Sequence, residues 1–187
     1  MEYVVRAVDV GYGNTKYVSG IVGCEIRCAS FPSITYPTVR DPAQNPAFER
    51  RKTVVVPIGD MFYEVGPDVD LAADSFRATQ MHDQYIHTPD YLALVRGALA
   101  MMKVRSIDLL VVGLPVSLFA ANKSALEKAM TGSHDVGGGK SVVVKKALAV
   151  AQPQGALADF VAQHDKGDSI ENERSLLIEQ QMRHQGA

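Results

Sequence analysis

The stretch VDVGYGNTKYV, residues 8–18, has valines on both sides of a short turn that contains one aspartate, two glycines and one lysine. Asp9 ends a valine-rich segment, so its carboxylate can reach a hydrated metal ion beyond the end of a strand. Gly11 and Gly13 carry no Cβ, and a ligand can therefore approach this backbone closely. Successive N–H groups in such a turn form an anion-binding concavity.

The other polar residues of the turn suit the same ligand. Asn14 and Thr15 add short polar donors, and Lys16 adds a compact cation suited to phosphate oxygens. The pattern Asp-x-Gly-x-Gly-x-x-Lys thus contains the groups that a metal–triphosphate site needs. A glycine-rich hairpin whose aspartate caps its own turn explains the same residues. Because short motifs give many false positives, the chemistry alone leaves both interpretations open.

The segments around the turn predict a sheet. Residues 3–10 are rich in valine, as in a buried strand. Residues 14–21 and 23–31 follow as two more strands joined by short turns. These three segments predict a β-meander.

The residues that follow the meander have a different composition. Four prolines punctuate residues 32–46 and argue against a long helix there. Residues 52–58 and 61–65 then predict two strands around the Gly59-Asp60 turn, because β-branched residues flank it. We therefore expect residues of about 32–86 to form a small β-rich insertion.

The remaining chain alternates helices with strands. Thr88-Pro89-Asp90 predicts a helix start, and apolar residues follow at helical spacing from Tyr91 to Met102. This helix should lie buried against the sheet. Further elements are expected at residues 107–112 (strand), 117–130 (helix, closing at Gly132), 141–150 (strand) and 155–162 (helix). Together these elements predict a three-layer α/β fold.

Composition excludes several classes of protein. The chain has 187 residues and a net charge of −2, so no global field recruits nucleic acid, and the basic run at residues 50–52 is expected to be a solvated loop. The absence of a signal sequence and of a long apolar run indicates a cytoplasmic protein. Cys24 and Cys28 lie too far apart along a strand for a disulfide and are expected to be free.

Several motifs, taken in order, resemble one family. Residues 9–16 resemble the first phosphate loop of the actin superfamily, and most closely that of its ParM/StbA-like plasmid-segregation branch. The resemblance covers roughly residues 1–178. Four more motifs agree in order with that family: Phe31-Pro32-Ser33, Tyr63-Glu64-Val65-Gly66, Val112-Gly113-Leu114-Pro115-Val116 and Pro153-Gln154-Gly155-Ala156.

The resemblance implies a fold and a site. The fold would be an actin-like ATPase domain, which is RNase H-like and three-layered with a mixed sheet, over residues 1–163, with an inserted subdomain at about 32–86. Asp9 would hold Mg²⁺ through waters, and Gln154 would orient the hydrolytic water, with Gln152 as the alternative. Either glutamine could instead be a surface residue. The β- and γ-phosphates of ATP would be bound by Gly11, Tyr12, Gly13, Asn14, Thr15 and Lys16.

A second glycine-rich segment competes for the role of phosphate loop. Residues 136–141 read Val-Gly-Gly-Gly-Lys-Ser and superficially resemble a Walker A loop. That motif needs a glycine where this chain has His134, and it should open a helix. Ser141 and the valines after it predict a strand instead. We therefore expect a plain loop between a helix and a strand.

The end of the chain departs from the family pattern. A second phosphate loop should follow the apolar run at residues 175–178, but Glu179 stands where aspartate is expected, and no glycine follows at position 181. We expect residues 164–187 to be a frayed linker and the start of an incomplete second domain. A truncated or independently expressed half-protein is then expected to bind ATP only weakly, to hydrolyse little and not to polymerise normally.

These observations predict the first half of an actin-like filament ATPase for plasmid segregation. Its partners would be copies of itself and an adaptor bound to plasmid DNA, with no direct contact to nucleic acid or membrane. One alternative is a non-catalytic partner or cap of full-length filaments. Another is a fragment of a small-molecule kinase of the superfamily. An RNase H-like nuclease is a weaker alternative, because Asp108 and Asp159 are not at convincing strand ends for two-metal chemistry.

Overall fold

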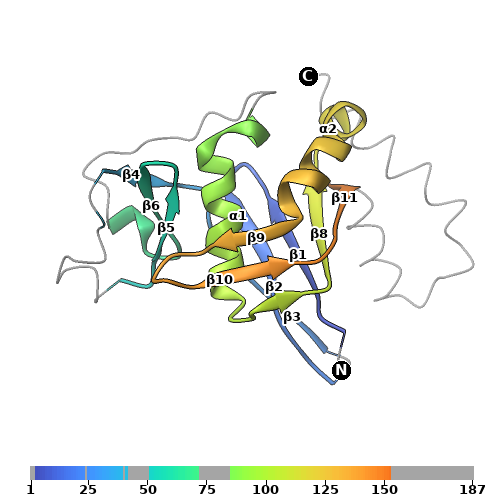
Figure 1. Cartoon of the computed structure of the whole chain (residues 1–187), viewed down its shortest axis with the longest axis horizontal. Coiled ribbons are helices and arrows are strands. Elements are labelled where there is room, and N and C mark those ends of the chain that lie inside the picture. Colours follow the sequence, from blue (N-terminus) through green and yellow to red (C-terminus); the bar gives the residue numbers. More distant parts are fainter. Residues whose placement is uncertain (1–2, 24, 40, 42–50, 72–84, 153–187) are drawn as a thin grey trace, which may run out of the picture.

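A five-stranded mixed sheet forms the centre of the computed structural model, which describes residues 3–23, 25–39, 41, 51–71 and 85–152. The order of its strands is β11-β8-β1-β2-β3 (Figure 1). The antiparallel meander predicted from the sequence is confirmed, as β1 (Val5–Val10), β2 (Asn14–Val22) and β3 (Glu25–Pro32). Two further strands, β8 (Leu109–Leu114) and β11 (Ala147–Ala151), extend the sheet parallel to β1. The expected α/β class with a mixed sheet is therefore correct.

The register of the parallel strands fixes which edge can hold a site. Val8 lies opposite Val112, which in turn lies opposite Ala149, and all three are buried on one face. Side chains alternate between faces along each strand. Because β1, β8 and β11 run parallel, their carboxyl ends meet at one edge of the sheet, and Asp9 lies there.

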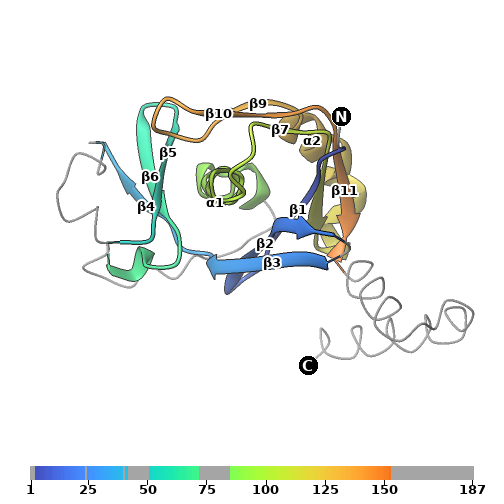
Figure 2. The same ribbon diagram turned by 90° about the horizontal axis from the view of Figure 1, so that it is seen from below.

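Helix α1 (Pro89–Met101) packs against the buried face of the sheet. Its predicted start is confirmed, because the Thr88 side chain accepts a hydrogen bond from the Tyr91 amide. Strands of all three sheets surround this helix (Figure 2). Gly97 lets α1 approach the inserted strands closely, since a Cβ at this position would lie 2.3 Å from a methyl carbon of Val65. The helix thereby joins the main sheet to the inserted one.

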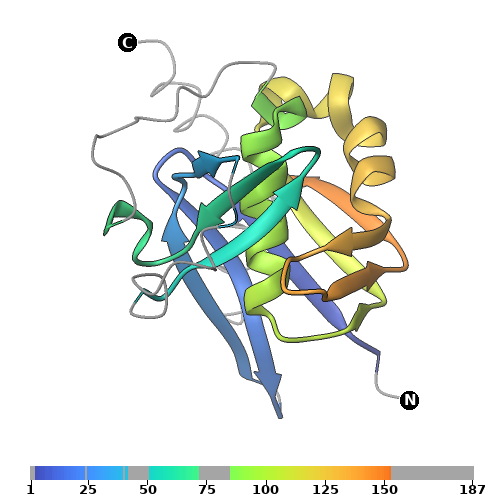
Figure 3. The ribbon, with the colours of Figure 1, turned by 60° about the vertical axis from the view of Figure 1, so that its left-hand side comes forward.

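The inserted segment forms a three-stranded antiparallel sheet of its own. Its order is β4-β6-β5, with β4 at Tyr36–Thr38, β5 at Val54–Ile58 and β6 at Met61–Val65. The predicted hairpin of β5 and β6 is confirmed, and these strands cross over α1 (Figure 3). Two short 3₁₀ helices follow, at Val69–Leu71 and Tyr85–His87. The outer limits of the insertion, about 32 and 86, stay a prediction.

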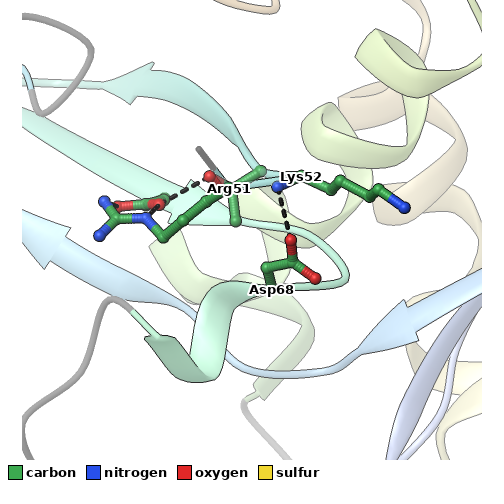
Figure 4. A network of polar contacts seen from close by, with 5 residues as sticks. Arg51, Lys52 and Asp68 are labelled. Carbon is green, nitrogen blue, oxygen red and sulfur yellow. Dashed lines mark hydrogen bonds and ion pairs between the residues drawn. The ribbon is translucent and has the colours of Figure 1, made fainter. Parts of the chain in front are cut away.

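The basic run at residues 50–52 is not simply a solvated loop. Arg51 makes a bidentate ion pair with Glu64, with N···O distances of 2.9 and 3.0 Å, and Glu64 is fully buried. Thr53 donates a further hydrogen bond to the same carboxylate, and the Lys52 amide donates to Asp68 (Figure 4). The expectation fails for Arg51 because a buried carboxylate needs a cation and donors around it. Arg50 lies outside the described residues.

The single strand predicted over residues 141–150 is two strands in different sheets. β10 (Ser141–Val144) pairs with β9 (Gly132–Asp135) and β7 (Ser106–Ile107), whereas β11 belongs to the main sheet. The chain leaves one sheet for the other at Lys145, whose ammonium contacts Asp108 at 2.7 Å. Periodicity cannot show this change of partner, because both halves are equally apolar.

Helix α2 (Val116–Met130) packs against β11 and β8; it ends at Met130 as predicted, but its capping residue differs from the prediction. Thr131 rather than Gly132 caps it, and Gly132 begins β9 with a φ of +122°. β9 was missed because Gly-Ser-His-Asp contains no β-branched residue. The helix predicted at residues 155–162 and Cys24 lie outside the described residues, and Cys28 is a free cysteine. Within the described part of the chain, no helix is both long and apolar enough to cross a membrane.

Candidate functional site

Asp9 is held in place by residues from two neighbouring strands. The amide Nε2 of Gln152, just after β11, donates a hydrogen bond of 2.8 Å to Oδ1 of Asp9. Gly113 of β8 lies beside the same oxygen, and a Cβ at this position would come within 2.4 Å of it. Any larger residue at position 113 would displace the carboxylate. Parallel pairing of β1, β8 and β11 therefore positions Asp9.

Lys16 lies directly across from Asp9 in the β1–β2 pair. Both residues line an open hollow of about 700 Å³, which Gln152 and Ser30 also line. Lys16 is exposed and Asp9 is half-buried. A carboxylate attracts a cation and an ammonium attracts an anion. The hollow thus offers both charges that a metal-bound phosphate requires.

The turn between β1 and β2 is braced on its inner side and open on its outer side. The Gly11 amide donates to the Asn14 carbonyl at 3.1 Å, and the Ser33 amide donates to the Gly13 carbonyl at 3.0 Å. The amides of Tyr12 and Gly13 donate no hydrogen bond to the rest of the described chain, and a Cβ at Gly13 would meet no atom within 4 Å. These amides and the exposed Asn14 are available to an anion.

Thr15 is placed differently from the other residues of the turn. It is fully buried, on the face that α1 covers, opposite Val10 and Phe31. Its hydroxyl makes a hydrogen bond of 3.0 Å with the Ser33 hydroxyl. The side chain therefore links β2 to the residue that follows β3, and it does not face the hollow that contains Asp9.

Two residues contact Asp9 that the sequence pattern did not mark as main candidates for the site, Gln152 and Gly113. Gln152 was only the alternative to Gln154, and it is the glutamine that contacts Asp9; Gln154 lies outside the described residues. In the sequence, Gly113 belongs to a strand-end motif and has no assigned role at the site. A usable signal existed for both, since each stands at the end of an apolar run that predicts a parallel strand.

The competing glycine-rich segment at residues 136–141 lies elsewhere. It connects β9 to β10, so the expected loop between a helix and a strand is instead a hairpin loop. It opens no helix, and a Cβ at Gly137 would lie 1.9 Å from the Val55 carbonyl oxygen. Gly137 therefore serves a close backbone contact with the inserted sheet, whereas Gly138 and Gly139 have open space around them.

Among the residues that the structure describes, the carboxylates needed for a nuclease do not gather around Asp9. Asp108 precedes β8, at the opposite end of the sheet, where it accepts hydrogen bonds from Lys145 and the Val4 amide; these bonds lower the pKa of this carboxyl. Five residues of strand place it about 16 Å from Asp9. Asp159 lies outside the described residues.

The donor set around Asp9 suits a hydrated cation. In the part of the chain that the structure describes, no group of three or more His, Cys, Asp or Glu side chains could hold a metal ion. Mg²⁺ keeps several of its waters and binds through one or two carboxylates together with phosphate oxygens. One well-oriented carboxylate beside an open turn fits Mg²⁺ bound to a nucleotide.

Comparison with known proteins assigns the family. The family profile described as "Actin like proteins N terminal domain" matches residues 7–155. Comparison with curated protein sequences finds no significant match.

Solved structures show the same fold. The apo ParM protein of pSK41 is 22% identical with a TM-score of 0.61, over 85% of this chain and 52% of ParM. The archaeal actin homolog Ta0583 is 21% identical with a TM-score of 0.61, over 86% of this chain and 48% of its own. The AlfA filament bound to AMPPNP is 20% identical with a TM-score of 0.57, over 83% of this chain and 57% of AlfA. The chain spans about half the length of these structures.

Proposed function

The chain belongs to the actin-like proteins, as their N-terminal domain, and we propose that it supplies the magnesium- and phosphate-binding half of an ATP site in a filament protein for plasmid segregation. The observation that carries this proposal is the placement of Asp9. Gln152 and Gly113 orient its carboxylate toward an open hollow, and Lys16 lies across from it. A plain hairpin needs none of these three neighbours.

Each residue then has a distinct task. Asp9 holds the hydrated Mg²⁺, while Lys16, Asn14 and the amides of Tyr12 and Gly13 bind the β- and γ-phosphates. Bound Mg²⁺ would neutralise charge on these phosphate oxygens. Gln152 keeps the Asp9 carboxylate in one orientation. We retain Gln154 as the residue that orients the attacking water.

The proposal extends to what the whole protein does. A relative solved with AMPPNP is a filament, and another is solved with ADP, which supports nucleotide binding coupled to self-association. We propose that the protein acts in the cytoplasm and meets plasmid DNA through an adaptor. Since this chain spans about half of its structural relatives, we expect it to bind ATP weakly by itself.

Amide chemical shifts of the ¹⁵N-labelled chain, titrated with millimolar ATP in Mg²⁺ or in EDTA, test this proposal. Such a titration detects weak binding. We expect shifts at residues 11–16 that are larger in Mg²⁺, and at least tenfold weaker binding for Asp9→Asn in Mg²⁺ only, since a charge-assisted contact is lost. The matched control is Asp60→Asn, an exposed carboxylate in the β5–β6 turn.

Two results would contradict the proposal. One is an absence of shifts in the β1–β2 turn at millimolar ATP. The other is equal Mg²⁺ dependence in the wild-type chain and in Asp9→Asn.

A further inference from the structure

Two tyrosine hydroxyls are buried directly behind the candidate site. Tyr91 is 2% exposed and Tyr85 is 6% exposed. Neither hydroxyl has a hydrogen-bond partner in the described chain. A buried polar group without a partner costs about 1–3 kcal/mol. A phenylalanine would fill either position without that cost, so the hydroxyls call for an explanation.

Both tyrosines line one small cavity of about 80 Å³. Gly11 and Tyr12 of the β1–β2 turn, together with Gly113 and Gln152, form another part of its wall. The last two residues are the ones that contact Oδ1 of Asp9. The cavity therefore adjoins the two residues that hold the Asp9 carboxylate, although Asp9 itself does not line it.

The cavity has the size and the polarity to hold ordered water. A water molecule occupies about 30 Å³ in the liquid and needs two to four polar partners. Besides the two tyrosines, Gln152 and Ser117 line the cavity, and all four residues have side-chain polar groups that can serve as such partners. Burial, and secondarily the charge of Asp9, raise the pKa of Tyr91, so its phenol stays protonated and can donate.

The position of the tyrosines is fixed by the fold. Tyr91 is in the first turn of α1, where its amide donates to Thr88, and the Thr88 hydroxyl donates to the carbonyl of Tyr85 at 2.6 Å. The two rings meet edge to face with centroids 5.9 Å apart. The start of the helix thus fixes the backbone of both tyrosines, and the edge-to-face contact packs their rings together.

We propose that Tyr91 and Tyr85 are positioning residues for a hydrated divalent cation: their hydroxyls hold water in this cavity, and that water fixes the hydration shell of the cation at Asp9. The inference rests on the proposed function, and it adds a second layer of residues beneath the site. We expect Tyr91 to contribute more than Tyr85, because it is the less exposed of the two.

The variant Tyr91→Phe tests this inference, because it removes the hydroxyl and keeps the ring. The readout is the Mg²⁺ concentration that gives half-maximal enhancement of ATP binding, followed by the amide shifts of residues 11–16. We expect about a fivefold increase in this concentration, with unchanged binding of ATP in EDTA. The melting temperature of the ligand-free variant should be unchanged or higher, since an unpartnered hydroxyl is removed. Tyr63→Phe, in β6, is the matched control.

The possible outcomes are distinguishable. If the wild-type chain shows Mg²⁺-dependent binding and Tyr91→Phe has the same Mg²⁺ requirement, this inference is wrong while the proposed function stands. If the wild-type chain shows no Mg²⁺ dependence, both are wrong. Tyr85→Phe provides a second test with a smaller expected increase, of about twofold, and applies even if the Tyr91 variant fails to fold.

Discussion

Two glycine-rich turns with a lysine nearby occur in this chain, and the fold uses them in opposite ways. The β1–β2 turn contains Gly11 and Gly13, neither of which has a positive φ, and its outer side is open. In the β9–β10 turn, Gly137, Gly138 and Gly139 have φ values of +84°, +59° and +67°. Gly13 leaves space for a ligand, whereas a Cβ at Gly11 would lie 3.0 Å from the Asn14 carbonyl oxygen. The three glycines of the second turn allow a tight backbone conformation.

The surroundings differ as much as the backbones. Asp9 and Gln152 lie at the foot of the first turn, where parallel strands end. The second turn closes on itself, with the Val136 amide donating to Lys140 and the Gly137 amide donating to Asp135. Gly137, at the start of this turn, lies against the edge strand β5 of the inserted sheet, whereas a Cβ at Gly138 or Gly139 would meet no atom within 4 Å. Glycine content alone thus identifies neither a site nor a packing contact.

Substituting Gly137 should produce the largest loss of stability. In Gly137→Ala the new Cβ would lie 1.9 Å from the Val55 carbonyl oxygen, at a φ that alanine rarely adopts. We expect the free energy of unfolding, measured by urea denaturation, to fall by about 2–4 kcal/mol. Gly139→Ala, which has open space around it, should cost only about 1–2 kcal/mol.

Gly13→Ala completes this series, because it has open space and no positive φ. It should change the free energy of unfolding by no more than about 0.5 kcal/mol. Equal losses for Gly137→Ala and Gly13→Ala would show that the two turns do not differ in packing.

The two lysines should differ in their effect on nucleotide binding. Lys16→Met removes the cation across from Asp9, and we expect the affinity for Mg²⁺·ATP to fall about fivefold to tenfold, or about 1–1.4 kcal/mol. Lys140→Met should leave that affinity unchanged, since Lys140 belongs to the β9–β10 turn. The same chemical-shift titration measures both. A larger loss in the Lys140 variant would reverse the assignment of the phosphate turn.

The smallest expected effect is a change in the free energy of unfolding with pH, caused by a histidine in β9, the strand that leads into the second turn. His134 in β9 is 4% exposed and its Nε2 lies 2.9 Å from the Met130 carbonyl oxygen. Burial lowers its pKa; the Met130 carbonyl opposes this effect, and nearby Arg96 adds to it. Above a pH of about 6.5 the histidine is neutral in both states. Below that pH the unfolded chain binds a proton more readily, so the free energy of unfolding falls.

Urea denaturation at pH 7.5 and pH 5.5 measures this change. His134→Gln keeps an amide donor for the Met130 carbonyl but does not titrate, so its loss of stability between the two pH values should be smaller than in the wild-type chain. An equal loss in both proteins would assign the pH dependence to other groups.

Local residue patterns were enough to predict most of the fold. The meander, the inserted hairpin and the start of α1 at Thr88 follow from periodicity and capping chemistry. The strand predicted at residues 107–112 is found two residues later, as β8 (Leu109–Leu114), and Ile107 belongs to β7 instead. The change of sheet at Lys145 could not be predicted in this way. It depends on which edges are free once the other strands have paired, and this is a tertiary property.

The residue pattern alone predicts a glycine-rich turn at residues 9–16, after a buried strand, with a carboxylate before it and a lysine after it. What that turn faces depends on how distant segments pack together. Pairing of β1 with β8, and of β8 with β11, brings Gly113 and Gln152 to Asp9, although they lie over 100 residues away in the chain. Packing of α1 places Tyr91 beneath them. Contacts between residues so distant depend on which elements pair, and no local pattern contains that information.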